Sequence, residues 1–125
     1  MSPEDRRKAP RLTLAIEDGY FGSFQLPNAE NLVAPILNLS AGGLNMLVSG
    51  QTRERIKEGD TLLLKTIVGG TRLAFLSDID AHVRWIREEG GQVHAGCEFE
   101  NLPEDVLLQL NKFVSTERMT RGQYD

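Results

Sequence analysis

Apolar and polar residues alternate over several short stretches of the chain, which is the pattern of half-buried β-strands. The first stretch begins at Arg11, where Leu12, Leu14 and Ile16 are separated by more polar neighbours. Six strand regions are predicted in this way, over residues 11–26 with a turn or bulge at Asp18-Gly19, 32–39, 44–48, 61–68, 72–87 with a break near Ser77-Asp78, and 92–99.

Tight-turn sequences separate most of these strands. Gly69-Gly70 is a turn, and residues 88–91 form a hairpin loop. Pro35 lies within one apolar strand and predicts an edge position or a bulge, because proline cannot donate a ladder hydrogen bond. One helical turn is expected within residues 51–58. Six short strands joined mainly by tight turns predict a mainly β fold, an antiparallel sheet closed into a small barrel.

After residue 101 the apolar residues no longer recur at every second position but at the spacing of three or four that is typical of a helix. Leu102, Val106, Leu110 and Phe113 recur at helical spacing, with Val114 beside them. Pro103 suits a first helical position, and the two acidic residues after it suit the positive end of the helix dipole. We therefore expect a helix from Pro103 to about Glu117 that plugs one end of the barrel or covers one face.

These elements give one domain and two terminal segments. Residues 1–10 are charged, contain two prolines and predict a flexible arm. Residues 11–118 hold the barrel and the helix, and residues 119–125 are expected to be frayed. A chain of 125 residues suits a single domain, which buries roughly two-thirds of the surface that its unfolded form exposes.

Composition narrows the classes of function. The net charge of −4 disfavours general binding to DNA or RNA, which usually needs a basic face. A single cysteine, Cys97, excludes an internal disulfide and fits a reduced, cytoplasmic setting. No apolar run approaches the ~18 residues that span a bilayer, and the polar start of the chain shows no secretory signal, so we expect no membrane insertion.

A cluster of arginines lies at the junction of the arm and the first strand. Arg7 and Arg11 have an R-x-x-x-R spacing, and Arg6 stands beside them. Pro10 argues against a helix there, so the cluster is expected on an extended segment. Arginine forks bind phosphate and the acceptor edge of guanine. A solvated charge run is the alternative interpretation of such a cluster taken alone.

A second cluster of chemistry-bearing residues follows the strand over residues 32–39. Asn38, Ser40 and Gly43 have an N-x-S-x-x-G spacing, with Gly42 inside it. Such a turn can supply side-chain hydrogen bonds and let a ligand approach bare backbone. An ordinary turn between strands is the alternative. Taken together with the arginines, the segment predicts a site for a small planar anion.

The pattern resembles the PilZ family, the bacterial receptor domains for cyclic di-GMP. RRKAPR at residues 6–11 and NLSAGGL at residues 38–44 carry the resemblance, which covers residue 6 to about 116. Weaker similarities lie in residues 58–64, 81–91 and 94–105. The two motifs are specific when they occur together at this separation. The resemblance implies a six-stranded antiparallel PilZ-like β-barrel with a C-terminal α-helix.

The resemblance also implies the ligand and the residues that bind it. Arg6, Arg7 and Arg11 correspond to the arginines that hold guanine edges and phosphates of cyclic di-GMP. Asn38, Ser40, Gly42 and Gly43 form the turn that surrounds one guanine. Asn38 stands at a position that is Asp or Asn in the family, and a neutral amide makes a weaker contact than a carboxylate.

The function implied is that of a cytoplasmic cyclic di-GMP receptor. Ligand binding would order the arm against the barrel, and a downstream protein partner in motility, exopolysaccharide production or virulence control would detect the change. The first alternative is a PilZ-like protein–protein interaction module that binds no nucleotide; such members usually lack the arginine motif. The second is a barrel that binds single-stranded nucleic acid, which the acidic net charge and the eight aromatic residues (one Trp, two Tyr, five Phe) disfavour.

No catalytic constellation or metal site is predicted. A nucleophilic Ser40 would need a base, and no histidine has an evident reason to lie beside it. His94 and Cys97 have an H-x-x-C spacing, but on a strand their side chains point to opposite faces. We therefore expect a binding domain with no cofactor, and not an enzyme.

Trp85 allows two interpretations. On a regular strand it shares a face with Val83 and Arg87, which favours a core or barrel-wall position over a platform for base stacking. The sequence leaves open whether Trp85, Arg84 or Arg87 contacts the ligand.

Overall fold

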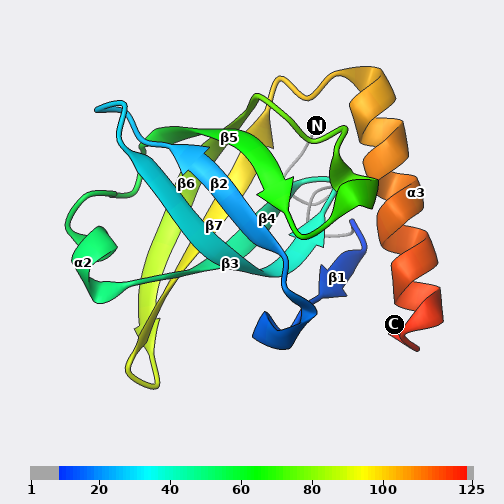
Figure 1. The fold of residues 1–125 in the computed structure, drawn as a ribbon, viewed down its shortest axis with the longest axis horizontal. Helices are drawn as coiled ribbons and strands as arrows, with labels where there is room; N and C mark the ends of the chain where they lie inside the picture. The colour runs from blue at the N-terminus through cyan, green and yellow to red at the C-terminus, as the bar shows by residue number, and fades with distance from the viewer. Residues whose placement is uncertain (1–8, 124–125) are drawn as a thin grey trace.

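A single antiparallel sheet makes up most of the computed structural model, which describes residues 9–123 (Figure 1). The strands of the described residues are β1 (Arg11–Thr13), β2 (Phe21–Gln25), β3 (Asn31–Ser40), β4 (Gly43–Val48), β5 (Thr61–Val68), β6 (Ile79–Glu89) and β7 (Gln92–Glu100). The helical elements are η1 (Ile16–Asp18), α2 (Gly50–Arg53), η2 (Thr71–Leu73) and the long α3 (Glu104–Thr120).

Six of the strands close on themselves. The order β3-β2-β5-β6-β7-β4 is completed by antiparallel pairing of β3 with β4, so these strands form a barrel. β1 is a seventh strand added to the outer part of β3. The structure thus confirms the mainly β fold, a six-stranded antiparallel barrel followed by a helix, and adds one short strand to it.

β3 is long enough to pair with two strands along the same edge. Its first half, Asn31–Pro35, pairs with β2, and its last residues pair with β1. Pro35 is the last residue of β3 in the ladder with β2, and the register toward β4 shifts between Ile36 and Asn38. The bulge expected near Pro35 is therefore present just after it, where β3 changes neighbours.

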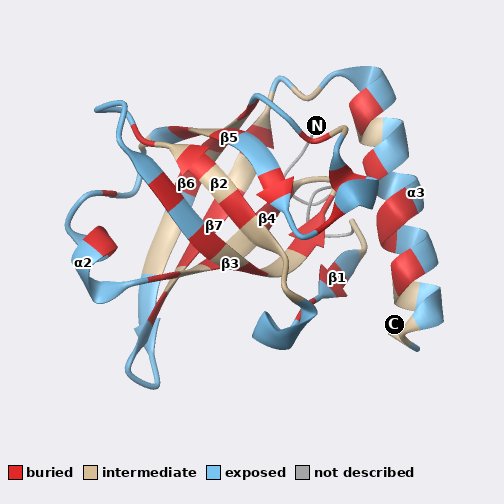
Figure 2. Cartoon of the chain, viewed as in Figure 1, coloured by how far each residue is buried: buried red, intermediate tan, exposed pale blue. Residues whose placement is uncertain are grey.

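Buried residues alternate with more exposed ones along most of the strands (Figure 2), and the buried residues make up the hydrophobic core. Phe24, Ile36 and Leu64 are among the fully buried side chains. Cys97 also faces inward, and burial raises the pKa of its thiol to about 12. A thiol with so high a pKa stays protonated at neutral pH and acts as a small apolar side chain.

α3 lies at the opposite end of the molecule from α2 and packs against β1, β3 and η2 (Figure 1). Its buried apolar residues are the expected ones: Val106, Leu110, Phe113 and Val114. Glu117 continues the same buried stripe and is paired with Arg72, whose guanidinium also lies 4.9 Å from the centroid of the Phe113 ring. The predicted helix is thus confirmed, although it ends three residues later than expected.

Two segments differ from the predicted strands. Residues 71–73 form η2 rather than a strand, because Leu73 and Leu76 are buried at the i, i+3 spacing of a helical turn. The first strand ends at Thr13 rather than near residue 17. The Asp18 carboxylate accepts the Ala15 N–H at 2.7 Å, which stabilises η1 at the expense of further strand.

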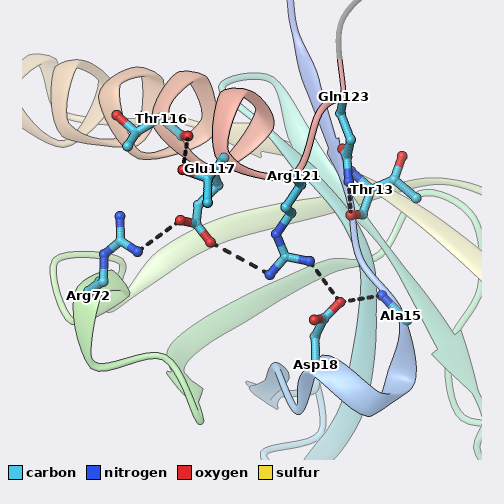
Figure 3. A network of polar contacts seen from close by, with 9 residues as sticks. Thr13, Ala15, Asp18, Arg72, Thr116, Glu117, Arg121 and Gln123 are labelled. Atoms are coloured by element: carbon cyan, nitrogen blue, oxygen red, sulfur yellow. Dashed lines mark hydrogen bonds and ion pairs between the residues drawn. The ribbon is translucent and has the colours of Figure 1, made fainter.

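Residues 119–123 lie in the segment that the sequence predicts to be frayed, and two of them contact the start of the barrel; residues 124–125 lie outside the described residues. Arg121 forms an ion pair with Asp18 at 3.0 Å, and the Gln123 side chain bonds the backbone of Thr13 (Figure 3). The structure therefore ties the end of α3 to β1 and η1. Sequence periodicity could not reveal these contacts, since they join residues about a hundred positions apart.

Gly43 is required where β4 meets β7. A Cβ placed on Gly43 would lie 1.9 Å from the Cys97 carbonyl oxygen and 3.0 Å from the Glu98 Cα. Both atoms belong to the backbone of β7, so neither can move without disturbing the ladder between these strands. The absence of a side chain at Gly43 is a condition for closing the barrel at this point.

We expect Gly43→Ala to destabilise the fold by about 2–3 kcal/mol, because an overpacked site must push two strands apart. The measurement is urea unfolding followed by far-UV circular dichroism. Gly50→Ala is the matched control, since a Cβ there meets no atom within 4 Å. Equal stability of the two variants would contradict this account of barrel closure.

Asp18 should make stability depend on acid pH. Its bond from the Ala15 N–H, and secondarily its pairing with Arg121, hold its pKa below the ordinary value of about 3.9. The unfolded chain therefore takes up this proton first, so the stabilisation is present above about pH 4 and is lost as the pH falls through the folded-state pKa. Asp18→Asn should be less stable than wild type at pH 7, and this difference should shrink at pH 3. Urea unfolding at both pH values measures it, with Glu58→Gln as the control for loss of one surface carboxylate; a difference that is independent of pH would exclude the Asp18 contribution.

Candidate ligand-binding surface

β1 brings the last arginine of the first motif onto the second motif. Arg11 is the cross-strand partner of Ser40, and its Nη1 donates to Asn38 Oδ1 at 2.7 Å. Leu12 is the middle residue of β1 and is fully buried. Because side chains alternate along a strand, its neighbours Arg11 and Thr13 both face outward. The convergence expected of the two motifs is therefore present for Arg11, whereas Arg6 and Arg7 lie outside the described residues.

The turn between β3 and β4 is held by its own polar groups. Ser40 Oγ accepts the Gly42 N–H at 3.1 Å, and the Gly42 carbonyl accepts the Phe99 N–H at 2.9 Å. Ser40 is fully buried, so its hydroxyl is part of the turn rather than an exposed donor. Ser40 therefore holds the backbone of the turn that follows Asn38.

Gly43 has a similar structural role. The sequence predicts that its missing side chain lets a ligand approach, but the Cys97 carbonyl fills that space. Gly43 acts on the candidate site indirectly, by bringing β7 against the turn.

Strand register places further polar residues beside the motifs on the outer face. The first row across neighbouring strands is Arg11, Ser40, Gly43, Glu98 and His82. The second row is Thr13, Asn38, Asn45, Gly96 and Trp85. Sequence reasoning missed Glu98 and Asn45, because only the register of β4 and β7 brings them next to the motif residues.

Trp85 belongs to this outer face. The register of β6 against β7 shifts between Val83 and Trp85, so Val83 is buried inside the barrel while Trp85 lies outside. The expectation that the two share a face is wrong, since a bulge reverses the alternation. The indole covers Gly96, where a Cβ would lie 2.2 Å from the ring, and the Arg87 guanidinium stacks on it at 4.6 Å.

The tryptophan lies close enough to the motifs for one small ligand to reach both. Gly96 and Asn38 are both paired with Asn45, on opposite sides of β4. Two strand spacings of about 4.8 Å separate their backbones by roughly 10 Å. Arg84 is the residue at the bulge and is exposed. The surface thus combines arginine and amide donors with an aromatic ring.

Arg11 and Asn38 present donors of the kind that bind planar anions. Arg11 has five N–H donors and uses one of them, on Nη1, to bond Asn38. Asn38 accepts that bond with its carbonyl oxygen, so its amide nitrogen is left as a donor.

The His94 and Cys97 side chains lie on opposite faces of β7, since Cys97 is buried inside the barrel while His94 lies on the outer face. Among residues 9–123, no three His, Cys, Asp or Glu side chains form a group that could hold a metal ion. In the same residues, no helix has the length and apolarity needed to cross a membrane.

Comparison with solved structures gives close matches of the fold. The chain is similar to the PilZ domain of YcgR from Escherichia coli with c-di-GMP, with a TM-score of 0.74, 22% identity and coverage of 94% of this chain and 96% of that one. It is similar to the MrkH–c-di-GMP complex of K. pneumonia, with a TM-score of 0.72, 17% identity and coverage of 94% and 54%. It is also similar to the motility inhibitor MotI/DgrA of Bacillus subtilis, with a TM-score of 0.66, 14% identity and coverage of 91% and 52%. The chain thus spans about half the length of the latter two proteins.

A comparison with curated proteins gives no match. The family model described as "PilZ domain" matches residues 5–115, which include both motifs and every strand of the barrel. Since this match covers most of the sequence and the fold agrees with solved PilZ structures, the chain belongs to the PilZ domain family.

Proposed function

We propose that this chain is a receptor domain for cyclic di-GMP. The observation that supports it best is the contact between Arg11 and Asn38, which joins the two motifs at one place on the barrel surface. Family membership supports the same ligand, as does the presence of c-di-GMP in the YcgR and MrkH complexes to which the chain is similar.

The ligand chemistry fits the donors of this surface. Cyclic di-GMP carries two phosphate charges and two guanines with O6 and N7 acceptors, which arginine forks can bind in pairs. We assign this role to Arg11 together with Arg6 and Arg7. Because Arg11 has further N–H groups beyond the one given to Asn38, it can bind the ligand while it keeps that contact.

The turn is proposed to surround one guanine. Asn38 presents an amide nitrogen beside Arg11, while Ser40 and Gly42 hold the backbone of the turn in place. Gly43 contributes by keeping β7 close. The proposed site therefore combines two groups of residues. Arg6, Arg7, Arg11 and Asn38 contact the ligand, and Trp85 is the neighbouring aromatic group. Ser40, Gly42 and Gly43 hold the turn in place.

The proposed role is binding and not catalysis. The Cys97 thiol is buried, with its pKa raised to about 12 by desolvation, and the Ser40 hydroxyl is buried within the turn. A receptor of this kind acts in the cytoplasm, orders its arginine arm when the ligand binds, and is detected by a downstream protein in motility or exopolysaccharide production.

Titration with cyclic di-GMP tests the proposal. We expect saturable binding by isothermal titration calorimetry together with a change in fluorescence of Trp85, the single tryptophan. Arg11→Ala should weaken binding at least about fivefold, since an arginine–guanine contact contributes ~1–3 kcal/mol. Arg53→Ala on α2 is the matched control, because it removes the same charge at the other end of the molecule and should leave the affinity unchanged.

Cyclic di-AMP provides the test of base identity. Adenine has no O6 acceptor, so we expect it to bind much more weakly than cyclic di-GMP. Absence of cyclic di-GMP binding in the wild-type chain would overturn the proposal and favour the protein–protein interaction module. Equal affinity of Arg11→Ala and wild type would show that the ligand occupies another surface.

A further inference from the structure

The strand that carries Arg11 is held from its other edge by a residue after α3. The Thr13 N–H donates to Gln123 Oε1 at 2.8 Å, and Gln123 Nε2 donates to the Thr13 carbonyl at 2.9 Å (Figure 3). This pair of bonds reproduces what a neighbouring antiparallel strand supplies to one residue. The Gln123 side chain therefore takes the place of a strand beside β1.

An ion pair made by Arg121, two residues before Gln123, strengthens the attachment. Arg121 Nη1 lies 3.0 Å from Asp18 Oδ2, and the same carboxylate oxygen accepts the Ala15 N–H just after β1. The Glu117 carboxylate lies 3.6 Å from the Arg121 guanidinium and 2.9 Å from that of Arg72 (Figure 3). Glu117 thus holds the Arg121 side chain from within α3. We call the contacts of Gln123 and Arg121 with residues 13–18 the helix clasp.

Apart from the clasp, β1 is held by its three-pair ladder with β3 and by the burial of Leu12. It is three residues long, and Arg11 lies two positions before Thr13 on the same outward face. A three-residue strand at the margin of a sheet is locally less stable than the barrel core. Two hydrogen bonds at its open edge therefore affect how firmly the strand is held. The clasp therefore acts on the position of Arg11.

We propose that Gln123 is a positioning residue for the arginine motif and that the helix clasp couples ligand binding at the β1–β3 edge to the end of α3. The inference rests on the proposed function, since it concerns the affinity for cyclic di-GMP. Coupling of this kind is reciprocal: if the clasp favours ligand binding, the bound ligand stabilises the clasp to the same extent.

The clasp is separate from the packing that holds α3 on the barrel. The helix is anchored by Val106, Leu110, Phe113 and Val114, which are buried well before Gln123. Both Thr13–Gln123 bonds are solvent-exposed. Removal of the Gln123 amide should therefore loosen β1 while the barrel and the helix remain folded.

Gln123→Ala is the principal test. We expect the Kd for cyclic di-GMP to rise about 5- to 10-fold, the loss that two exposed hydrogen bonds produce, while the thermal unfolding midpoint falls by at most a few degrees. Thr120→Ala is the matched control: it lies in the last turn of α3, and its hydroxyl donates to the Thr116 carbonyl of the same helix. Gln123→Glu is a second variant of equal size, which places an oxygen against the Thr13 carbonyl and should also weaken binding.

Two further measurements distinguish positioning from general loss of stability. The Thr13 amide should exchange its hydrogen faster in Gln123→Ala than in wild type, and cyclic di-GMP should slow this exchange in wild type. Gln123→Ala should have little further effect on affinity when combined with Arg11→Ala, because Gln123 acts through Arg11.

The outcomes separate the two proposals. If wild type binds cyclic di-GMP and Gln123→Ala binds it equally well, the inference is overturned and the receptor function stands. An equal loss of affinity in the single variant and in the Arg11→Ala background also overturns it. If wild type does not bind, the receptor function fails, and the coupling fails with it.

Discussion

The pairing of β1 with the end of β3 is the constraint on which the candidate site depends. Only three residue pairs make this ladder, and the central one joins Leu12 to Leu39, both fully buried. Side chains alternate along a strand, so burial of Leu12 obliges Arg11 to face outward, where it meets Asn38. Burial of this one apolar side chain thereby places the Arg11 donor at a defined position on the barrel.

Sequence patterns located most of the barrel because its elements are locally encoded. The strand over residues 61–68 has the predicted bounds, and the buried stripe of α3 follows directly from helical spacing. Failures occurred where tertiary contacts decide between local alternatives. Leu73 and Leu76 are both buried, which a helical turn allows at a spacing of three, whereas a regular strand would place them on opposite faces. Trp85 was placed on the wrong face because one bulge residue in β6 reverses the alternation without any local signal.

The residues of the candidate site can be predicted from the two motifs, but the structural role of each residue cannot. The spacing and the family resemblance select Asn38, Ser40 and Gly43, whereas the structure shows that Ser40 holds the turn and that Gly43 accommodates the Cys97 carbonyl. A residue can thus be characteristic of a binding motif because the motif needs its backbone in one place. The register between β4 and β7 shows that Gly43 supports the turn and does not contact a ligand directly. This register cannot be predicted from the spacing of residues along the chain.

β1 has two edges, and each is used by a different part of the molecule. One edge pairs with the strand that carries Asn38, and the other receives the amide of Gln123 after α3. Any movement of this short strand must break or reshape bonds on both sides, because three residues cannot bend to satisfy one neighbour independently of the other. The barrel core is closely packed and deforms little, whereas a three-residue strand held at its open edge by exposed hydrogen bonds responds more readily to a change in those bonds. The physical link between the arginine motif and the helix is therefore expected to be β1 itself rather than the interior of the barrel.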